Sequence, residues 1–204
     1  MSMKGLYIVT PDWDDTDKMV SATEAAIKGG VSLVQYRHKT ASPELRKEQA
    51  SRLLALCRQY DRPFIINDFI ELCLELDADG IHVGGTDAPV AEVRKMIGPN
   101  KILGASCYGS LELAHKANES GASYVAFGGF YPSRVKKYEV TTPVDIITRA
   151  KQQLPVPVVV IGGMTQENSV PLVKAGTDMV AAISSVYMTD DPQASAQAFV
   201  KLFS

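Results

Sequence analysis

Short apolar segments alternate with longer amphipathic segments along the whole chain. The short segments have the length of β-strands, and the longer ones repeat apolar residues at the spacing of a helix face. Residues typical of helix ends frame several of them: Ser42 and Pro43 begin one, and Gly29 and Gly30 end another. We therefore predict strands over residues 5–9, 33–39, 63–66, 80–83, 102–106, 124–127, 156–161 and 178–183, and helices over 15–28, 43–60, 69–76, 89–97, 110–120, 143–153, 168–174 and 192–203.

The order of these elements predicts the fold class. Most of the strands are continuous apolar runs, which is typical of parallel strands covered on both faces. Eight strand-helix units predict an α/β protein, a closed (β/α)₈ TIM barrel formed as one domain over residues 1–204. A doubly wound open sheet is the alternative, but it normally carries a glycine-rich loop after its first strand, where this chain has Thr10, Pro11, Asp12 and Trp13.

The composition of the chain limits the kinds of molecule that we expect it to bind. Of the 204 residues 46% are hydrophobic and 22% charged, and the net charge is −2, so no basic excess points to nucleic acid. No apolar run approaches the roughly 20 residues of a membrane span, and no signal peptide precedes the first strand. Three scattered cysteines predict buried thiols in a reducing compartment. We expect a cytoplasmic protein with small-molecule ligands, and the sequence leaves a homodimer open.

The second strand carries the first candidate site residues. Side chains on a strand alternate between its two faces, so Gln35, Arg37 and Lys39 share one face. Two cations at the end of a buried strand predict an anionic ligand. The alternatives are a surface strand with one polar face, or an aldolase in which Lys39 forms a Schiff base.

In a (β/α)₈ barrel the active site lies at the carboxyl ends of the strands, and most of the unusual polar residues fall there. These residues are Gln35, Arg37, Lys39, Asn67, Asp68, Asp87, Ser106, Ser133, Arg134, Lys136, Lys137, Gly162, Gly163, Ile183, Ser184 and Ser185. Their convergence on one rim predicts a single site rather than unrelated surface groups.

Two loops of this rim predict phosphate binding. Gly162 and Gly163 follow the seventh strand, where a bare backbone can approach an anion. The long loop after the sixth strand contains Ser133 and Lys136, which could neutralise and hydrogen-bond a phosphate. The alternatives are a Gly-Gly turn needed only for its geometry, and a solvated basic loop.

Two carboxylates of the rim predict a metal site. Mg²⁺ favours one or two carboxylates together with water and substrate phosphate oxygens, and Asp68 and Asp87 are the best placed. The alternatives are a helix N-cap for Asp68 and a turn or cap for Asp87. Of the three histidines, we interpret His38 and His115 as structural and His82 as a core or supporting residue rather than a catalytic one.

These motifs together resemble the thiamine phosphate synthase (thiamine-phosphate pyrophosphorylase) family, and the resemblance runs from Leu6 to Ser184. Its landmarks here are Leu6-Tyr7-Ile8-Val9-Thr10, Gln35-Tyr36-Arg37-His38-Lys39, Ile66-Asn67-Asp68, Gly80-Ile81-His82-Val83-Gly84 with Asp87, Gly104-Ala105-Ser106, Tyr124-Val125-Ala126-Phe127-Gly128 and Ile161-Gly162-Gly163. The resemblance implies a transferase of thiamine biosynthesis. It would condense 4-amino-2-methyl-5-(diphosphooxymethyl)pyrimidine with 4-methyl-5-(2-phosphoethyl)thiazole to thiamine phosphate, releasing diphosphate by a dissociative substitution.

The resemblance also implies residue roles. Gln35, Arg37, Lys39, Asn67, Ser106 and Lys136 would bind the pyrimidine diphosphate, with Arg37, Lys39, Ser106 and Lys136 at the reacting centre. Asp68 and Asp87 would hold Mg²⁺, and Ser133, Val135, Gly163, Ile183 and Ser184 would form the thiazole phosphate site.

The chain departs from the family pattern at three places. Val135 stands where a second threonine is usual, Gly129 replaces a proline, and Gly85-Thr86 precedes Asp87 where glycine and glutamine are usual. A thiazole tautomerase of the same barrel family, or a non-catalytic barrel that binds phosphorylated ligands, are the alternative functions.

Overall fold

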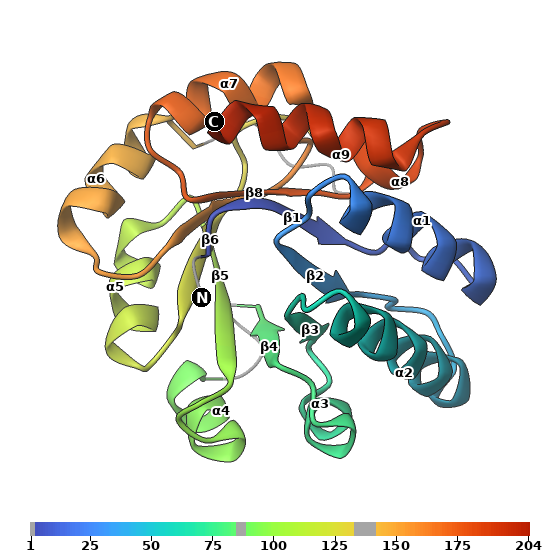
Figure 1. Ribbon diagram of the computed structural model, residues 1–204. Helices are drawn as coiled ribbons and strands as arrows, with labels where there is room; N and C mark the ends of the chain where they lie inside the picture. The colour runs from blue at the N-terminus through green and yellow to red at the C-terminus, as the bar shows by residue number, and fades with distance from the viewer. Residues whose placement is uncertain (1–2, 85–88, 133–141) are drawn as a thin grey trace.

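The computed structural model describes residues 3–84, 89–132 and 142–204, which form a closed barrel of parallel strands (Figure 1). The strands are β1 (Gly5–Val9), β2 (Leu33–Tyr36), β3 (Phe64–Asn67), β4 (Gly80–Val83), β5 (Ile102–Tyr108), β6 (Tyr124–Phe127), β7 (Val158–Val160) and β8 (Met179–Ala182). Each strand pairs with the next along the chain, and β1 closes the ring by pairing with β8, where Gly5 lies opposite Met179. The predicted (β/α)₈ fold is confirmed.

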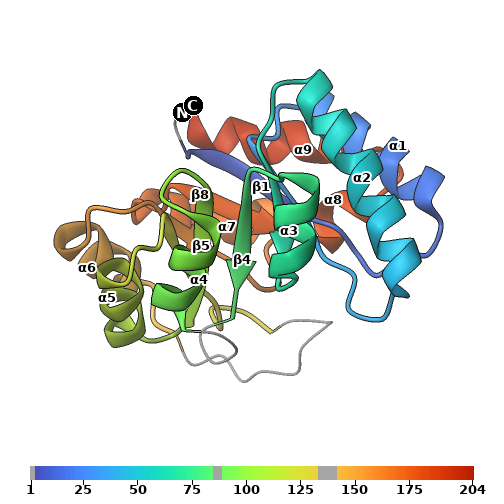
Figure 2. The ribbon, with the colours of Figure 1, turned by 90° about the horizontal axis from the view of Figure 1, so that it is seen from below.

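Helices surround the barrel on its outside (Figure 1). They are α1 (Thr16–Lys28), α2 (Pro43–Gln59), α3 (Ile70–Leu76), α4 (Val90–Ile97), α5 (Leu111–Glu119), α6 (Asp145–Gln153), α7 (Gln166–Lys174), α8 (Ser184–Tyr187) and α9 (Pro192–Val200), followed by the 3₁₀ turn Lys201–Phe203. None of the helices in the described ranges is both long and apolar enough to cross a membrane. Figure 2 shows both termini at the end of the barrel where the strands begin, which leaves the other end to the candidate site.

The predicted elements differ from the structure mainly at their ends. Helix α8 was not predicted, because four residues are too few to show a helical period. The last helix was predicted to run to residue 203, whereas α9 ends at Val200 and the 3₁₀ turn continues from there. The strand predicted over 33–39 ends at Tyr36, and the strand predicted over 156–161 is only Val158–Val160.

Contact with the segment after β1 continues for one residue past the end of β2. Arg37 donates its backbone N–H to Thr10 Oγ1 at 2.8 Å, and the same hydroxyl donates to the Arg37 carbonyl oxygen at 3.0 Å. The buried Thr10 side chain thus replaces the strand partner that β1 no longer supplies. Beyond that point Lys39 lies in a turn, yet Gln35, Arg37 and Lys39 all line one cavity while His38 is buried.

Two apolar layers hold the fold together. One fills the space between the strands and the helices, and the other fills the inside of the barrel with side chains such as Leu33, Ile65, Val159 and Met179. Burial of this apolar surface is the main source of stability. The inner layer also contains polar tyrosines, which lie below the candidate site.

Candidate active site

A cavity of about 980 Å³ opens at the carboxyl ends of the strands. It is lined by all the predicted site residues that belong to the described part of the chain: Gln35, Arg37, Lys39, Asn67, Asp68, Ser106, Gly163, Ile183 and Ser184. These residues come from β2, β3 and β5 and from the ends of β7 and β8. Their positions therefore agree with the expected rim, while their chemical roles remain predictions.

The cationic wall of the cavity is built by the segment after β2. Gln35 is almost fully buried, and the Arg37 side chain is 14% exposed, so the guanidinium is largely withdrawn from bulk water. Lys39 lines the same cavity two residues further on. An anion entering here would meet the largely buried guanidinium of Arg37 and the exposed side chain of Lys39.

The carboxylate wall follows β3. Asp68 has a left-handed backbone with φ of +64°, a conformation that aspartate tolerates better than most residues, and donates its N–H to the His82 carbonyl oxygen at 2.9 Å. Asn67 Nδ2 donates to Asp68 Oδ2 at 3.1 Å. The alternative interpretation of Asp68 as a helix N-cap is wrong, because the N-cap of α3 is Phe69 and no side chain caps that helix.

The third wall is a glycine turn after β7. Gly162 and Gly163 have φ of +101° and +66°, and a Cβ at Gly163 would lie 2.5 Å from the carbonyl oxygen of Pro132. Asn168 Nδ2 donates to the Gly163 carbonyl oxygen at 2.9 Å and steadies the turn. The turn geometry thus requires glycine, and it leaves a bare backbone facing the cavity beside the start of α8 at Ser184.

A chain of hydrogen bonds crosses the floor of the cavity. Gln35 Nε2 donates to Tyr7 Oη, which lies 2.7 Å from Tyr124 Oη; that hydroxyl lies 2.7 Å from His82 Nδ1, and His82 Nε2 lies 2.8 Å from Ser106 Oγ. The chain therefore links two predicted site residues, Gln35 and Ser106, through three side chains to which we had assigned no catalytic role.

The two tyrosines of this chain are neutral hydroxyls. Burial raises the pKa of both above the ordinary value of 10.0, so each carries one hydrogen. Gln35 Nε2 donates to Tyr7 Oη, and each hydroxyl of the chain can both donate and accept a hydrogen bond.

Sequence reasoning missed Tyr7 and Tyr124 as parts of the site. Both lie on strands that read as plain apolar runs, and a tyrosine in such a run looks like a core residue. The available signal was their hydroxyl groups, since a buried Tyr O–H needs a partner. His82 was expected to be a core or supporting residue, and its two contacts here agree with that expectation.

Six residues named in the sequence analysis lie outside the described residues: Asp87, Ser133, Arg134, Val135, Lys136 and Lys137. In the part of the chain that the structure describes, no three His, Cys, Asp or Glu side chains are grouped so that they could hold a metal ion by themselves.

The remaining histidines and the cysteines agree with structural roles. His115 Nε2 lies 2.8 Å from Gln153 Oε1 on the outside of the barrel, and His38 is buried behind the cationic wall. Cys57, Cys73 and Cys107 are buried free thiols.

Comparisons with known proteins place this geometry in a family. Residues 6–186 match a model of the family described as thiamine monophosphate synthase. The chain is 68% identical over 202 residues to the thiamine-phosphate synthase of Janthinobacterium sp. (strain Marseille), covering 99% of this chain and 98% of that one. It is 44% identical over 199 residues to that of Nitrosospira multiformis, covering 98% of this chain and 85% of that one.

A solved structure agrees with the sequence comparisons. The thiamine phosphate pyrophosphorylase from Pyrococcus furiosus superposes with a TM-score of 0.86 at 30% identity, covering 99% of this chain and 96% of the other. The similarity in fold thus extends over nearly the whole chain. The chain therefore belongs to the thiamine monophosphate synthase family.

Proposed function

We propose that the cavity condenses 4-amino-2-methyl-5-(diphosphooxymethyl)pyrimidine with 4-methyl-5-(2-phosphoethyl)thiazole, giving thiamine phosphate and diphosphate. The observation that carries the proposal is the meeting of Arg37, Lys39 and Asp68 in one cavity, opposite the Gly162-Gly163 turn. Two anionic groups can thus bind on separate walls, as two phosphorylated substrates require. The names of the relatives support the synthase rather than a thiazole tautomerase or a non-catalytic binding barrel.

The diphosphate would bind between the cationic wall and the carboxylate wall. Arg37 and Lys39 would neutralise its oxygens, and Asp68 would hold Mg²⁺ together with Asp87 and the diphosphate itself. Asp68 fits this role, since its carboxylate lines the cavity and does not cap a helix. When bound, the metal ion would supply positive charge that stabilises the departing diphosphate. Lys136, like Asp87, belongs to this proposal from its sequence position.

The pyrimidine would lie over the polar floor. Gln35 and Asn67 can hydrogen-bond its ring and amino group, and the Ser106 hydroxyl, which lies 2.8 Å from His82 Nε2, can form a further hydrogen bond to the ligand. In a dissociative substitution the diphosphate leaves first and the electron-rich pyrimidine carries the positive charge, after which the thiazole nitrogen attacks. Such a reaction needs the leaving charge neutralised and the partners aligned more than it needs a general base.

The thiazole phosphate would bind at the glycine turn. Loops after the seventh and eighth strands, with the start of a short extra helix, frequently form a phosphate site in this fold, and α8 follows β8 here in that manner. Gly163, Ile183 and Ser184 supply this wall, and Ser133 and Val135 would complete it. Since Val135 lacks a hydroxyl, we expect Val135→Thr to tighten thiazole phosphate binding in a calorimetric titration, and an unchanged affinity would contradict this role.

The test is diphosphate release by the purified protein with both substrates and Mg²⁺. We expect stoichiometric diphosphate and thiamine phosphate, and no release when the thiazole phosphate is omitted. Release without the thiazole would indicate a hydrolase. Binding without release would indicate a ligand-binding barrel, and aromatisation of the thiazole alone would indicate a tautomerase.

A further inference from the structure

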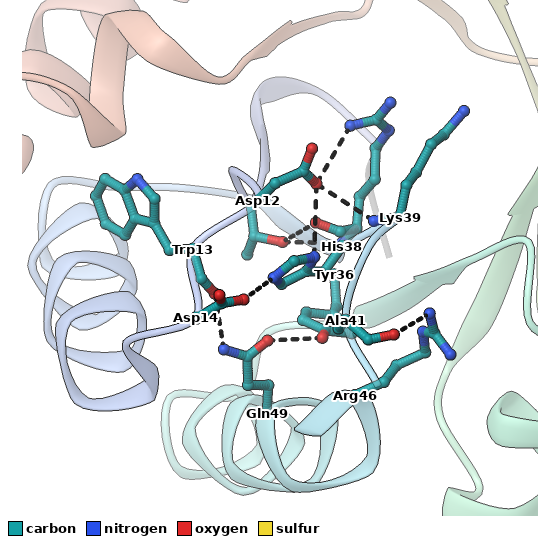
Figure 3. A network of polar contacts seen from close by, with 11 residues as sticks. Asp12, Trp13, Asp14, Tyr36, His38, Lys39, Ala41, Arg46 and Gln49 are labelled. Atoms are coloured by element: carbon teal, nitrogen blue, oxygen red, sulfur yellow. Dashed lines mark hydrogen bonds and ion pairs between the residues drawn. The ribbon is translucent and has the colours of Figure 1, made fainter. Parts of the chain in front are cut away.

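Three consecutive residues of the cationic segment surround one carboxylate oxygen. Asp12 Oδ1 accepts from the backbone N–H of Lys39 at 3.3 Å and lies 3.7 Å from Arg37 Nη1. His38 Nδ1 lies 3.9 Å from the same oxygen and has no hydrogen-bond partner among the described residues. Figure 3 shows Asp12 above the imidazole of His38, with the Lys39 side chain extending away from both. A single carboxylate from the loop after β1 therefore contacts the whole segment that forms the cationic wall.

The three residues face different sides of the segment. Arg37 and Lys39 point to the cavity while His38 points to the opposite side, so contacts within the segment cannot fix all three side chains. Asp12 belongs to the neighbouring chain segment, two residues after Thr10, which already pairs with the Arg37 backbone. Asp12 therefore lies beside both the cavity side of this segment, which carries Arg37, and its buried side, which carries His38.

His38 fixes the loop from its buried side. Its side chain is 1% exposed, and its Nε2 lies 2.8 Å from Asp14 Oδ1. A carboxylate only accepts, so Nε2 carries the hydrogen and donates. Gln49 Nε2 donates to the Trp13 carbonyl oxygen at 2.8 Å, and Tyr36 Oη donates to Gln49 Oε1 at 2.7 Å, so the residue between the two aspartates is held as well (Figure 3).

We propose that Asp12, braced by the His38–Asp14 contact, is a positioning residue that aims Arg37 and Lys39 at the leaving diphosphate. The inference rests on the proposed function and extends it to a residue that does not line the cavity. Asp12 acts through the cations and need not touch the substrate. Without it the Arg37 guanidinium would have to be ordered by the substrate itself, which costs binding affinity.

Whether removal of Asp12 weakens or tightens diphosphate binding distinguishes a positioning role from a purely electrostatic one. A negative charge beside Arg37 and Lys39 opposes the binding of an anion. If charge were the only role of Asp12, its removal would tighten diphosphate binding. If positioning dominates, removal weakens binding although a repulsive charge has gone.

The experiment compares Asp12→Ala and Asp12→Asn with the unmodified protein. Binding of inorganic pyrophosphate with Mg²⁺ is measured by calorimetry, and kcat and KM are measured with both substrates. We expect Asp12→Ala to raise the pyrophosphate Kd about tenfold, the usual worth of a hydrogen bond to a charged group, and to lower kcat as well. Asp12→Asn keeps an oxygen near the Lys39 N–H, so we expect it to recover part of both losses.

Asp17→Ala is the matched control, because it removes the same charge from a side chain that is 88% exposed and pairs with Arg52 on the outer surface. It is expected to leave both readouts unchanged. A merely structural role of Asp12 would lower the melting temperature with unchanged kinetics below it. Tighter or equal pyrophosphate binding by both Asp12 variants would overturn the proposal.

A second variant covers the case in which Asp12→Ala does not fold. Asp14 is 83% exposed, so Asp14→Ala should fold, and loss of its contact with His38 should weaken pyrophosphate binding in the same direction. Unchanged binding in that variant would overturn the bracing role. Failure of the proposed function is distinguishable, since the unmodified protein itself would then neither bind pyrophosphate nor release it from the substrate pair.

Discussion

Replacing Tyr124 with phenylalanine tests the polar floor of the cavity most directly. The ring is fully buried and would keep its place, so the change removes one oxygen and little else. That oxygen lies 2.7 Å from both Tyr7 Oη and His82 Nδ1. The substitution therefore cuts the chain between Gln35 and Ser106 in its middle.

The expected loss of stability follows from these two contacts. A buried donor or acceptor that loses its partner costs about 1–3 kcal/mol, and the desolvation of the deleted hydroxyl is recovered in part. We therefore expect the free energy of unfolding to fall by about 2–4 kcal/mol. For a chain of this length that is a drop of about 10 °C in the melting temperature.

Activity should fall as well, because the chain orients both residues at its ends. Without the Tyr124 hydroxyl, Tyr7 Oη and His82 Nδ1 each lose one contact, so the hold of these side chains on Gln35 and Ser106 is weakened. We expect kcat/KM for diphosphate release to fall about tenfold to a hundredfold, as for a modest misplacement of reacting groups.

The assays are urea unfolding followed by fluorescence and steady-state diphosphate release. Tyr187→Phe is the control: this tyrosine is equally buried, and its hydroxyl contacts Thr23 at 2.7 Å on the helix side of the fold. It should lose stability and keep its kcat/KM. If Tyr124→Phe also kept full kcat/KM, the hydrogen-bond chain would not orient the site, and this reasoning would be refuted.

Three further predictions address the walls and the core. Asp68→Asn, which suits the φ of +64°, should abolish Mg²⁺-dependent diphosphate release with an unchanged melting temperature; retained turnover would remove Asp68 from the metal site. Gly163→Ala should lower the free energy of unfolding by about 1–3 kcal/mol and raise the KM for thiazole phosphate, because the new Cβ would contact Pro132. Gly98→Ala is the control: no atom lies within 4 Å of a Cβ at that position, so it should show only backbone strain. Burial raises the pKa of the Cys57 and Cys107 thiols from 9.0 to about 12 and that of Cys73 to about 11. The stability that these neutral thiols contribute is therefore complete below pH 9.0 and is lost as the pH rises towards 12. Urea unfolding across that interval should show a falling free energy of unfolding, and a flat profile would contradict this prediction.

The barrel could be predicted from the sequence because the strand patterns, the helix ends and the order of the elements all indicated the same fold. Continuous apolar strands, capped helices and their strict alternation leave few other folds. The shared cavity face of Gln35, Arg37 and Lys39 was also predicted, and Thr10 pairs with the backbone of Arg37 beyond the end of β2. What failed were element ends, which depend on side-chain contacts such as this one.

The hydrogen-bond chain on the cavity floor and the contacts of Asp12 could not be predicted from the sequence pattern. Tyr7 and Tyr124 are 117 residues apart, and only the register of the closed barrel brings their hydroxyls together. The alternative of an N-cap at Asp68 was reasonable from local sequence, but the backbone turns at that residue and leaves the capping position to Phe69. The residue types along the chain thus indicated which side chains belong to the site, whereas the closure of the barrel determined which of them contact one another.

Gly104 on β5 illustrates a consequence for sequence divergence. A Cβ there would lie 2.1 Å from Tyr124 Cζ and 2.2 Å from its hydroxyl oxygen, so the two positions share one volume. A larger residue at 104 is compatible only with a smaller one at 124, which would also remove the hydroxyl that joins Tyr7 to His82. Any evolutionary path through this pair must therefore change several inward positions together, and single steps along it should be strongly epistatic.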